Sequence, residues 1–180
     1  STNHRVVPLH HYGFFTTVEG LYKELNKETE QKVKKNINKL IPLQNEKNNF
    51  QEDGFNLLRD LTTLHKEKRV YIKTQHVLNK LITFLRNDNK LPAICFVFSR
   101  KRVEAFAQMI NISLISEEDE PFNVAKECER IMRRLPNFKE YMELPEYVSL
   151  VSLLEKGIGI HHSGMIPILR EIVELMISKK

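Results

Sequence analysis

The residues with the clearest chemical potential lie between positions 157 and 164, which read Gly-Ile-Gly-Ile-His-His-Ser-Gly. Gly159 and Gly164 have the G-x-x-x-x-G spacing of a phosphate-binding loop. Met165 and Ile166 follow where a nucleotide-binding loop needs Lys and then Ser or Thr, so no nucleoside triphosphate site is predicted. A glycine-rich turn ahead of a helix still directs backbone N–H groups and the helix dipole towards an anion. Two interpretations remain: a site for a nucleic-acid phosphate, or an ordinary tight turn that uses glycine for its backbone geometry.

A second candidate segment, Phe-Val-Phe-Ser-Arg-Lys-Arg, occupies positions 96–102. Ser99 is a favourable helix N-cap. The first turn of the helix that it would begin contains three basic residues, Arg100, Lys101 and Arg102. Exposed cations there oppose the helix dipole, at a cost of about 0.3–1 kcal/mol each. The cluster therefore indicates a phosphate at this helix start, and Arg170 repeats the pattern in the last helix; ordinary solvated side chains are the alternative.

Paired histidines at His10-His11 and His161-His162 raise the question of a metal site. Neighbouring residues on a strand point to opposite faces, and neither pair has a further Cys or His at ligand spacing, so no metal site is predicted. In the second pair we expect one histidine in the core and the other facing the loop. The sequence contains no G-x-S-x-G nucleophile elbow and no paired-carboxylate spacing, so no catalytic or cofactor-binding residue is predicted.

Hydrophobic periodicity predicts the elements that must position these residues. Helices are predicted over 19–40, 57–64, 77–85, 103–110, 124–135, 148–154 and 165–176. The continuous apolar run at 93–98 predicts a strand buried on both faces of a parallel sheet, and 157–161 predicts a second strand. Residues 5–15 are expected to be extended, and 45–54 to form a polar loop. Strands that alternate with helices indicate an α/β fold, a parallel sheet flanked by helices.

Composition limits what this fold can be. The chain has 180 residues, of which 41% are hydrophobic and 28% charged, with a net charge of +5. These values suit one globular domain and exclude a wholly disordered chain. The longest apolar run, 91–98, is far shorter than the roughly 18 residues that a membrane span needs. Cys95 and Cys128 lie in apolar patterns, so both are expected to be buried thiols in a reducing compartment, the cytosol or nucleus.

The two candidate segments together resemble the superkiller-type (Ski-like) DExH-box RNA helicases of superfamily 2. Residues 96–102 resemble motif IV, and residues 157–171, GIGIHHSGMIPILRE, resemble motif IVa of the second RecA-like domain. Residues 5–12, Arg-Val-Val-Pro-Leu-His-His-Tyr, resemble the R-P-V-P-L-x-H-Y segment that joins the two RecA-like domains, although Val6 stands where the family often has Pro. The pairs between the two motifs also follow the family's order: Leu135-Pro136, Leu144-Pro145 and Leu153-Leu154.

The resemblance covers residues 1–15 and about 91–180, and it implies three regions. Residues 1–18 would be an interdomain linker and 19–90 a variable helical insertion with a polar loop. Residues 91–180 would be the first part of the second RecA-like domain, helix-rich because its sheet is incomplete. Both ends of the chain look cut, so we expect a longer protein whose missing strands, motif V and motif VI follow Lys180.

The resemblance implies part of an ATP-dependent RNA helicase that moves 3′-to-5′ and grips the phosphates of the translocating RNA strand. The chain lacks Walker A, the DExH box and motif VI, so alone it is expected to be inactive. ATP and Mg²⁺ would be bound mainly by other parts of the protein. The residues implied to lie at the RNA strand are Ser99, Arg100, Lys101, His162, Ser163, Gly164 and Arg170. Phe98 is expected to pack beneath motif IV.

RNA is the implied partner, together with RNA-degradation or RNA-processing machinery, and no membrane is implied. Two alternatives remain. One is a degenerate helicase domain that serves, without enzymatic activity, as a binding platform for RNA or protein. The other is a DNA-unwinding helicase of the same superfamily, which shares the H-H-[SA]-G turn. The abundance of Lys, Asn and Ile is typical of an AT-rich genome, such as a viral or protozoan one.

Overall fold

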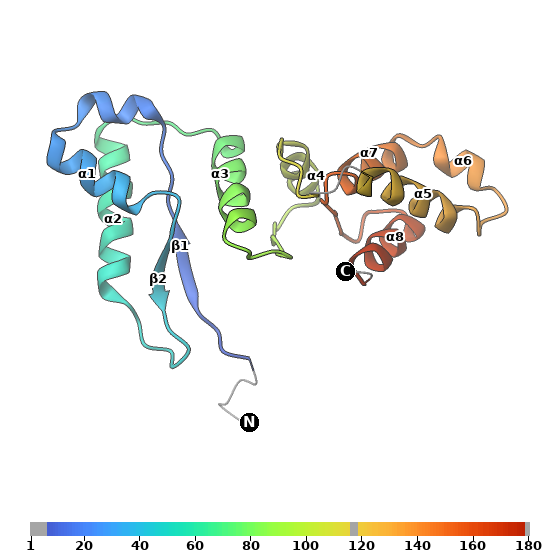
Figure 1. Cartoon of the computed structure of the whole chain (residues 1–180), viewed down its shortest axis with the longest axis horizontal. Helices are drawn as coiled ribbons and strands as arrows, with labels where there is room; N and C mark the ends of the chain where they lie inside the picture. Colours follow the sequence, from blue (N-terminus) through green and yellow to red (C-terminus); the bar gives the residue numbers. More distant parts are fainter. Residues whose placement is uncertain (1–6, 116–118, 179–180) are drawn as a thin grey trace. The chain divides into compact units, whose positions relative to one another are not determined.

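The computed structural model describes residues 7–115 and 119–178. The chain divides into two compact units, Ser1–Asp88 and Asn89–Lys180, which we call the N-terminal unit and the C-terminal unit (Figure 1). The described residues are rich in helix and contain one two-stranded sheet. None of the helices in these ranges is both long enough and apolar enough to span a membrane.

The N-terminal unit is built around its antiparallel sheet, in which Phe14 lies opposite Leu40. The elements in chain order are β1 (His11–Phe14), the 3-10 helix η1 (Glu19–Glu24), α1 (Lys27–Asn36), β2 (Leu40–Gln44), α2 (Glu52–Glu67) and α3 (Thr74–Asn87). Helix α2 packs against β2. The buried core of the unit consists of Leu21, Val33, Ile41 and Leu61.

Local residue types explain where these elements begin and how closely they pack. Asn26 is the N-cap of α1, and its side chain accepts a hydrogen bond from the Thr29 amide at 2.8 Å. Asn38 has a φ of 54°, a left-handed conformation that Asn tolerates, and it turns the chain from α1 into β2. A Cβ atom on Gly54 would lie 1.9 Å from the Pro42 carbonyl oxygen. Glycine is therefore required for α2 to approach β2 this closely.

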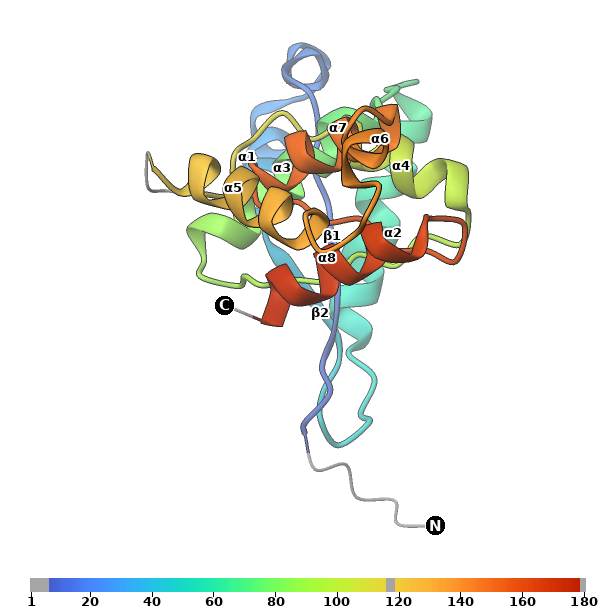
Figure 2. The ribbon, with the colours of Figure 1, turned by 90° about the vertical axis from the view of Figure 1, so that its right-hand side faces the viewer.

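The described part of the C-terminal unit is helical. Its elements are α4 (Arg100–Gln108), α5 (Glu120–Met132), α6 (Phe138–Met142), α7 (Pro145–Leu154) and α8 (Pro167–Ser178). Helix α5 packs against α6, α7 and α8, the group that faces the viewer in Figure 2. Residues that are at most 1% exposed form the centre of their core: Cys128, Ile131, Met132, Leu150, Ile172 and Val173. A smaller buried cluster joins α4 to α7 and to the coil that follows it, through Ala107, Leu153 and Ile158.

The parallel sheet predicted for the C-terminal unit does not form in the residues that the structure describes. Residues 93–98 are not a strand, and Phe96 is 81% exposed while Phe98 is fully exposed. Residues 157–161 also lie outside any strand, although Ile158 is buried. A strand needs a neighbouring strand to pair its backbone N–H and C=O groups, and neither segment has one in this part of the chain.

Several other predictions are settled by the structure. The single helix predicted over 19–40 is wrong, because the chain ends α1 at Asn36 and returns to pair β2 with β1. Cys95 is exposed, against expectation, since the segment around it is not packed, whereas Cys128 is buried as predicted. The short helix α6 was not predicted, and the chain forms two compact units where its composition suited one. The other predicted helices are confirmed, as is extended chain at β1; residues 5 and 6 lie outside the described ranges.

Candidate nucleic-acid interface

Helix α4 begins where the sequence predicts. Ser99 is its N-cap, with an extended backbone, and the Ser99 hydroxyl accepts a hydrogen bond from the Arg102 amide at 3.4 Å. The first turn contains no acidic residue, and the side chains of Arg100, Lys101 and Arg102 are exposed. Three cations and the positive end of the helix dipole therefore share one surface, which favours an anion there.

The other candidate segment is a coil and turn that leads into α8. Gly157 has a φ of +78°, which glycine adopts without steric cost. A Cβ atom on Gly159 would lie 3.0 Å from Cγ1 of Val173, so the coil runs close against α8. The glycines thus bring residues 161–164 to the start of α8 as a tight turn, which we call the 161–164 turn.

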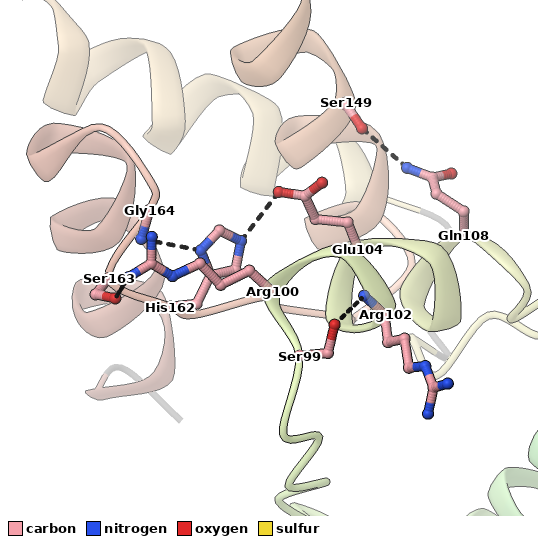
Figure 3. Close-up of polar contacts among 9 residues, drawn as sticks. All are labelled: Ser99, Arg100, Arg102, Glu104, Gln108, Ser149, His162, Ser163 and Gly164. Carbon is pink, nitrogen blue, oxygen red and sulfur yellow. Dashed lines mark hydrogen bonds and ion pairs between the residues drawn. The ribbon is translucent and has the colours of Figure 1, made fainter.

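The two candidate segments meet in the structure, as Figure 3 shows. Nη2 of Arg100 donates a hydrogen bond to Oγ of Ser163 at 2.7 Å. Nε2 of His162 lies 3.0 Å from Oε1 of Glu104. These contacts join residues that are 63 and 58 positions apart in the sequence. The basic start of α4 and the 161–164 turn therefore form one surface.

Arg100, a predicted residue, lies in a row of polar residues on α4 with Glu104 and Gln108, which were not predicted; we call this row the α4 polar stripe. Residues four apart lie on one face of a helix. All three contact the neighbouring part of the unit. Arg100 and Glu104 contact the 161–164 turn, and Nε2 of Gln108 donates a hydrogen bond to Oγ of Ser149 on α7 at 2.9 Å (Figure 3). The four-residue spacing was visible in the sequence, but the same spacing is typical of ordinary pairs on an exposed helix.

Gly164 lies between the stripe and the turn. Its amide donates a hydrogen bond to Nδ1 of His162 at 3.2 Å. A Cβ atom on Gly164 would lie 3.3 Å from both Nδ1 of His162 and Cδ of Arg100. The absence of a side chain at this position therefore allows the arginine and the histidine to approach from two sides.

The other two predicted residues, Lys101 and Arg170, are not joined to the turn by a hydrogen bond in the described part of the chain. Lys101 is exposed and Arg170 is half-buried. Nε of Arg170 is buried and has no hydrogen-bond partner among the described residues. The structure thus brings together Arg100, His162, Ser163 and Gly164 through direct contacts, and it places Lys101 and Arg170 in the first turns of α4 and α8.

The two histidines of the turn point to different helices. Nε2 of His161 lies 2.8 Å from Oε1 of Glu174 on α8, whereas His162 faces Glu104 on α4. The side chain of His162 is 11% exposed and that of His161 is 49% exposed, so one is nearly buried and the other is open to solvent. Among residues 7–115 and 119–178, no group of three or more His, Cys, Asp or Glu side chains could hold a metal ion.

Two ionisable groups in the core of the unit have strongly altered pKa values. Burial raises the pKa of the Cys128 thiol to about 11 and that of the Tyr147 hydroxyl to about 12. Both groups are therefore uncharged at neutral pH, and a protonated thiol is a poor nucleophile. We assign both residues to packing, apart from the polar surface on α4 and the 161–164 turn.

Comparison with known proteins gives consistent matches. The chain is 30% identical to the DExH-box ATP-dependent RNA helicase DExH9 of Arabidopsis thaliana over 179 residues, which covers 97% of the chain. It is 30% identical to the exosome RNA helicase MTR4 of Mus musculus over 192 residues, covering 99% of the chain. It is 35% identical to the antiviral helicase SKI2 of Saccharomyces cerevisiae over 100 residues, covering 56%. No protein-family model matches the chain.

All three matched relatives are named helicases, and the first is named a DExH-box RNA helicase. The chain is therefore similar, over nearly its whole length, to a segment of Ski-like DExH-box RNA helicases, which confirms the resemblance carried by the two motifs. The chain spans 17%, 16% and 8% of the lengths of these three relatives, so it corresponds to one segment of such a protein. The relatives come from a plant, a mouse and a yeast, and they lend no support to a viral source.

Proposed function

We propose that the chain is part of an ATP-dependent RNA helicase, and that the start of α4 and the 161–164 turn together bind phosphates of one RNA strand during 3′-to-5′ unwinding. The observation that carries the proposal is the hydrogen bond from Arg100 to Ser163, because it unites the two motifs into one surface. The names of the relatives, which describe RNA helicases, favour RNA over DNA as the substrate.

The chemistry of the surface suits a phosphate. A guanidinium group has five N–H donors, and Ser163 accepts from one nitrogen of Arg100, which leaves other donors for phosphate oxygens. Lys101 adds a mobile charge at the same helix start, and Ser99 shapes that start as its cap. Arg170 would reach the strand from the first turn of α8. Its buried Nε has no hydrogen-bond partner among the described residues, and a ligand oxygen could supply one. Phosphate contacts of this kind position a strand without reading its sequence.

ATP and Mg²⁺ enter the proposal through the longer protein. Neither Gly159 nor Gly164 is followed by the Lys-[ST] pair of a nucleotide loop, so these residues are not assigned to ATP. ATP hydrolysis in another part of the longer protein would change how tightly this surface binds RNA at each step of translocation. If the full-length protein has no RNA-stimulated ATPase activity, the segment is instead a non-enzymatic binding platform.

We also propose that residues 93–98 and 157–161 become strands of a RecA-like parallel sheet in the full-length protein. The support is the exposed apolar run at 93–98, because a run of this kind is typical of strands buried on both faces. Hydrogen exchange of the full-length protein tests this assignment. Slow exchange of the amides in 93–98 is expected, and fast exchange would contradict it.

The wider assembly is proposed from the relatives. One is named an exosome RNA helicase and another a superkiller complex protein, so we propose RNA-degradation machinery as the partner. The matches to DExH9 and MTR4 run through residues 16–90, whereas that to SKI2 covers about half of the chain. A reducing compartment, the cytosol or nucleus, suits the free thiols Cys95 and Cys128.

The test of the phosphate site is the salt dependence of RNA binding by the full-length protein. The logarithm of the affinity falls linearly with the logarithm of the salt concentration, and its slope counts the phosphate contacts. Arg100→Ala and Arg170→Ala should each weaken binding to RNAs of any sequence and reduce the slope by about 0.7–1. Arg69→Ala, an arginine substitution in the N-terminal unit, is the control. An unchanged slope in the first two variants would contradict the proposal.

A further inference from the structure

We propose that Glu104 is a positioning residue, which acts through the His162 ring to hold the Gly164 amide and the 161–164 turn in place beside Arg100. This inference rests on the proposed function, because the segment held in place is the proposed phosphate-binding turn. Glu104 lies on the α4 polar stripe, four residues after Arg100, so both side chains leave the same face of the helix (Figure 3).

The contacts form a continuous relay from α4 to the turn. Oε1 of Glu104 lies 3.0 Å from Nε2 of His162, and Nδ1 of the same ring lies 3.2 Å from the Gly164 nitrogen. Both ring nitrogens are therefore occupied. The His162 side chain is 11% exposed, so its ring is mostly enclosed by protein rather than free to extend to a ligand.

The hydrogen-bond roles in this relay are fixed by chemistry. A backbone amide can only donate, so Nδ1 of His162 must accept and carry no proton. The proton of a neutral ring is then on Nε2, where it faces the carboxylate of Glu104, a group that only accepts when ionised. Glu104 thus selects the tautomer that accepts from the Gly164 amide. Without Glu104, the ring loses the interaction that fixes its orientation and its tautomer.

The negative charge of Glu104 allows a positioning role to be distinguished from a simple charge effect on RNA binding. A carboxylate on the same helix face as Arg100 repels RNA phosphates, and by charge alone its removal should strengthen RNA binding. The positioning role predicts weaker RNA binding for a variant in which residue 104 cannot accept the hydrogen bond from Nε2 of His162. The two roles can therefore be separated by comparing an alanine with a glutamine at position 104, because both remove the charge and glutamine retains an accepting oxygen.

The matched control is Glu174, the partner of the neighbouring histidine His161. Glu174 on α8 pairs with His161 at 2.8 Å, and its side chain is similarly exposed, 64% against 58% for Glu104. Substituting Glu174 removes the same charge from a carboxylate that contacts the same turn. Among the described residues, no backbone amide bonds to the His161 ring, so only the charge effect should appear.

The experiment uses the full-length protein in five forms, which are wild type, Glu104→Ala, Glu104→Gln, Glu174→Ala and Glu174→Gln. The affinity for single-stranded RNA is measured by fluorescence anisotropy over a range of salt concentrations. Hydrogen exchange of the peptide that contains Gly164 is followed by mass spectrometry. Glu104→Ala should bind RNA about 3- to 10-fold more weakly, with an unchanged salt slope because no phosphate contact is lost.

The remaining forms complete the expected pattern. Glu104→Gln should bind as wild type does, or slightly more tightly. Glu104→Ala should also exchange the Gly164 peptide faster, because the amide loses its acceptor, whereas Glu104→Gln should not. Both Glu174 variants should match wild type in exchange and bind RNA equally or slightly more tightly.

Two outcomes would overturn the inference. Tighter or unchanged RNA binding by Glu104→Ala, with normal exchange, would show that the residue acts only as a charge. Equal losses in Glu104→Ala and Glu104→Gln would show that the accepted hydrogen bond is not what matters. Failure of the proposed function looks different: Arg100→Ala would leave the salt slope unchanged while the exchange difference between the Glu104 variants persisted, and the positioning role would stand.

Discussion

Each unit contains a pair of histidines, and the two pairs are used in different ways. In the N-terminal unit, His65 and His76 both bond to one uncharged residue: Nε2 of His65 lies 2.9 Å from the Thr17 hydroxyl and Nε2 of His76 lies 3.0 Å from the Thr17 carbonyl oxygen. Thr17 is buried. In the C-terminal unit, His161 and His162 each face a carboxylate that is exposed to solvent.

This difference separates residues that support the fold from residues that shape a surface. The carbonyl oxygen of Thr17 can only accept, so His76 must donate to it, and the two rings tie α2 and α3 to the same buried segment. Burial lowers the pKa of His65, which keeps it neutral in this environment. At the 161–164 turn, charged partners hold a segment whose residues His161, Ser163 and Gly164 are exposed to solvent and which we propose binds phosphate. Substitutions should therefore affect mainly stability in the first case and mainly RNA binding in the second.

The largest effect on stability is expected in the core of the C-terminal unit. Ile172→Ala removes a fully buried side chain from α8 and should lower the free energy of unfolding by about 2–5 kcal/mol. Ile177→Ala, on the same helix but exposed, should change it by less than about 0.5 kcal/mol. Urea unfolding of the two variants measures both values. Similar losses would show that the core of this unit is not packed as described.

The next effect concerns the close approach of α2 to β2 in the N-terminal unit. Gly54→Ala places a Cβ atom 1.9 Å from the Pro42 carbonyl oxygen, so the backbone must shift. The overpacking should cost about 1–3 kcal/mol even though alanine favours helix. Gly20→Ala, which has no atom within 4 Å of the new Cβ, is the control and should be nearly neutral. Thermal unfolding would contradict the packing if the two variants behaved alike.

Gly164→Ala tests whether the corresponding glycine of the C-terminal unit serves binding rather than stability. The new Cβ would lie 3.3 Å from the His162 ring and from Arg100, so these neighbours must move by a few tenths of an ångström. RNA binding by the full-length protein should weaken by about 2- to 5-fold, which is below about 1 kcal/mol. Its unfolding free energy should change by less than about 0.5 kcal/mol. A loss of stability as large as that of Gly54→Ala would remove the distinction between the two units.

The smallest effect is the pH dependence that His65 confers. Burial lowers the pKa of His65 from 6.5, so the unfolded chain binds a proton more readily than the folded chain. The contribution of His65 to stability is fully present above pH 6.5 and is lost as the pH falls through the folded-state pKa. His65→Gln removes this dependence, so urea midpoints at neutral and mildly acidic pH should differ less in the variant than in wild type. An equal difference would assign the acid sensitivity to other groups.

Local patterns predicted most of the helices, because helix formation depends on near neighbours in the sequence. The spacing of Val124, Cys128 and Ile131 placed these residues on one face of α5, and all three are buried. The two predicted strands failed for the opposite reason. Residues 93–98 have the composition of a buried strand, but a strand exists only when a distant segment pairs with it. Cys95 was misassigned together with that segment.

The sequence by itself determined the ends and faces of the elements at the candidate site. The Ser99 cap and the cations after it, the glycines of the turn and the motifs of the Ski-like family can all be read without coordinates. Tertiary structure alone decided that Arg100 contacts Ser163 and that Glu104 contacts His162. Those partners are about sixty residues apart, and their approach is set by the buried cluster that packs α4 against α7 and the coil after it. No local pattern encodes such a pairing, because it arises from how apolar faces of separate elements fit together.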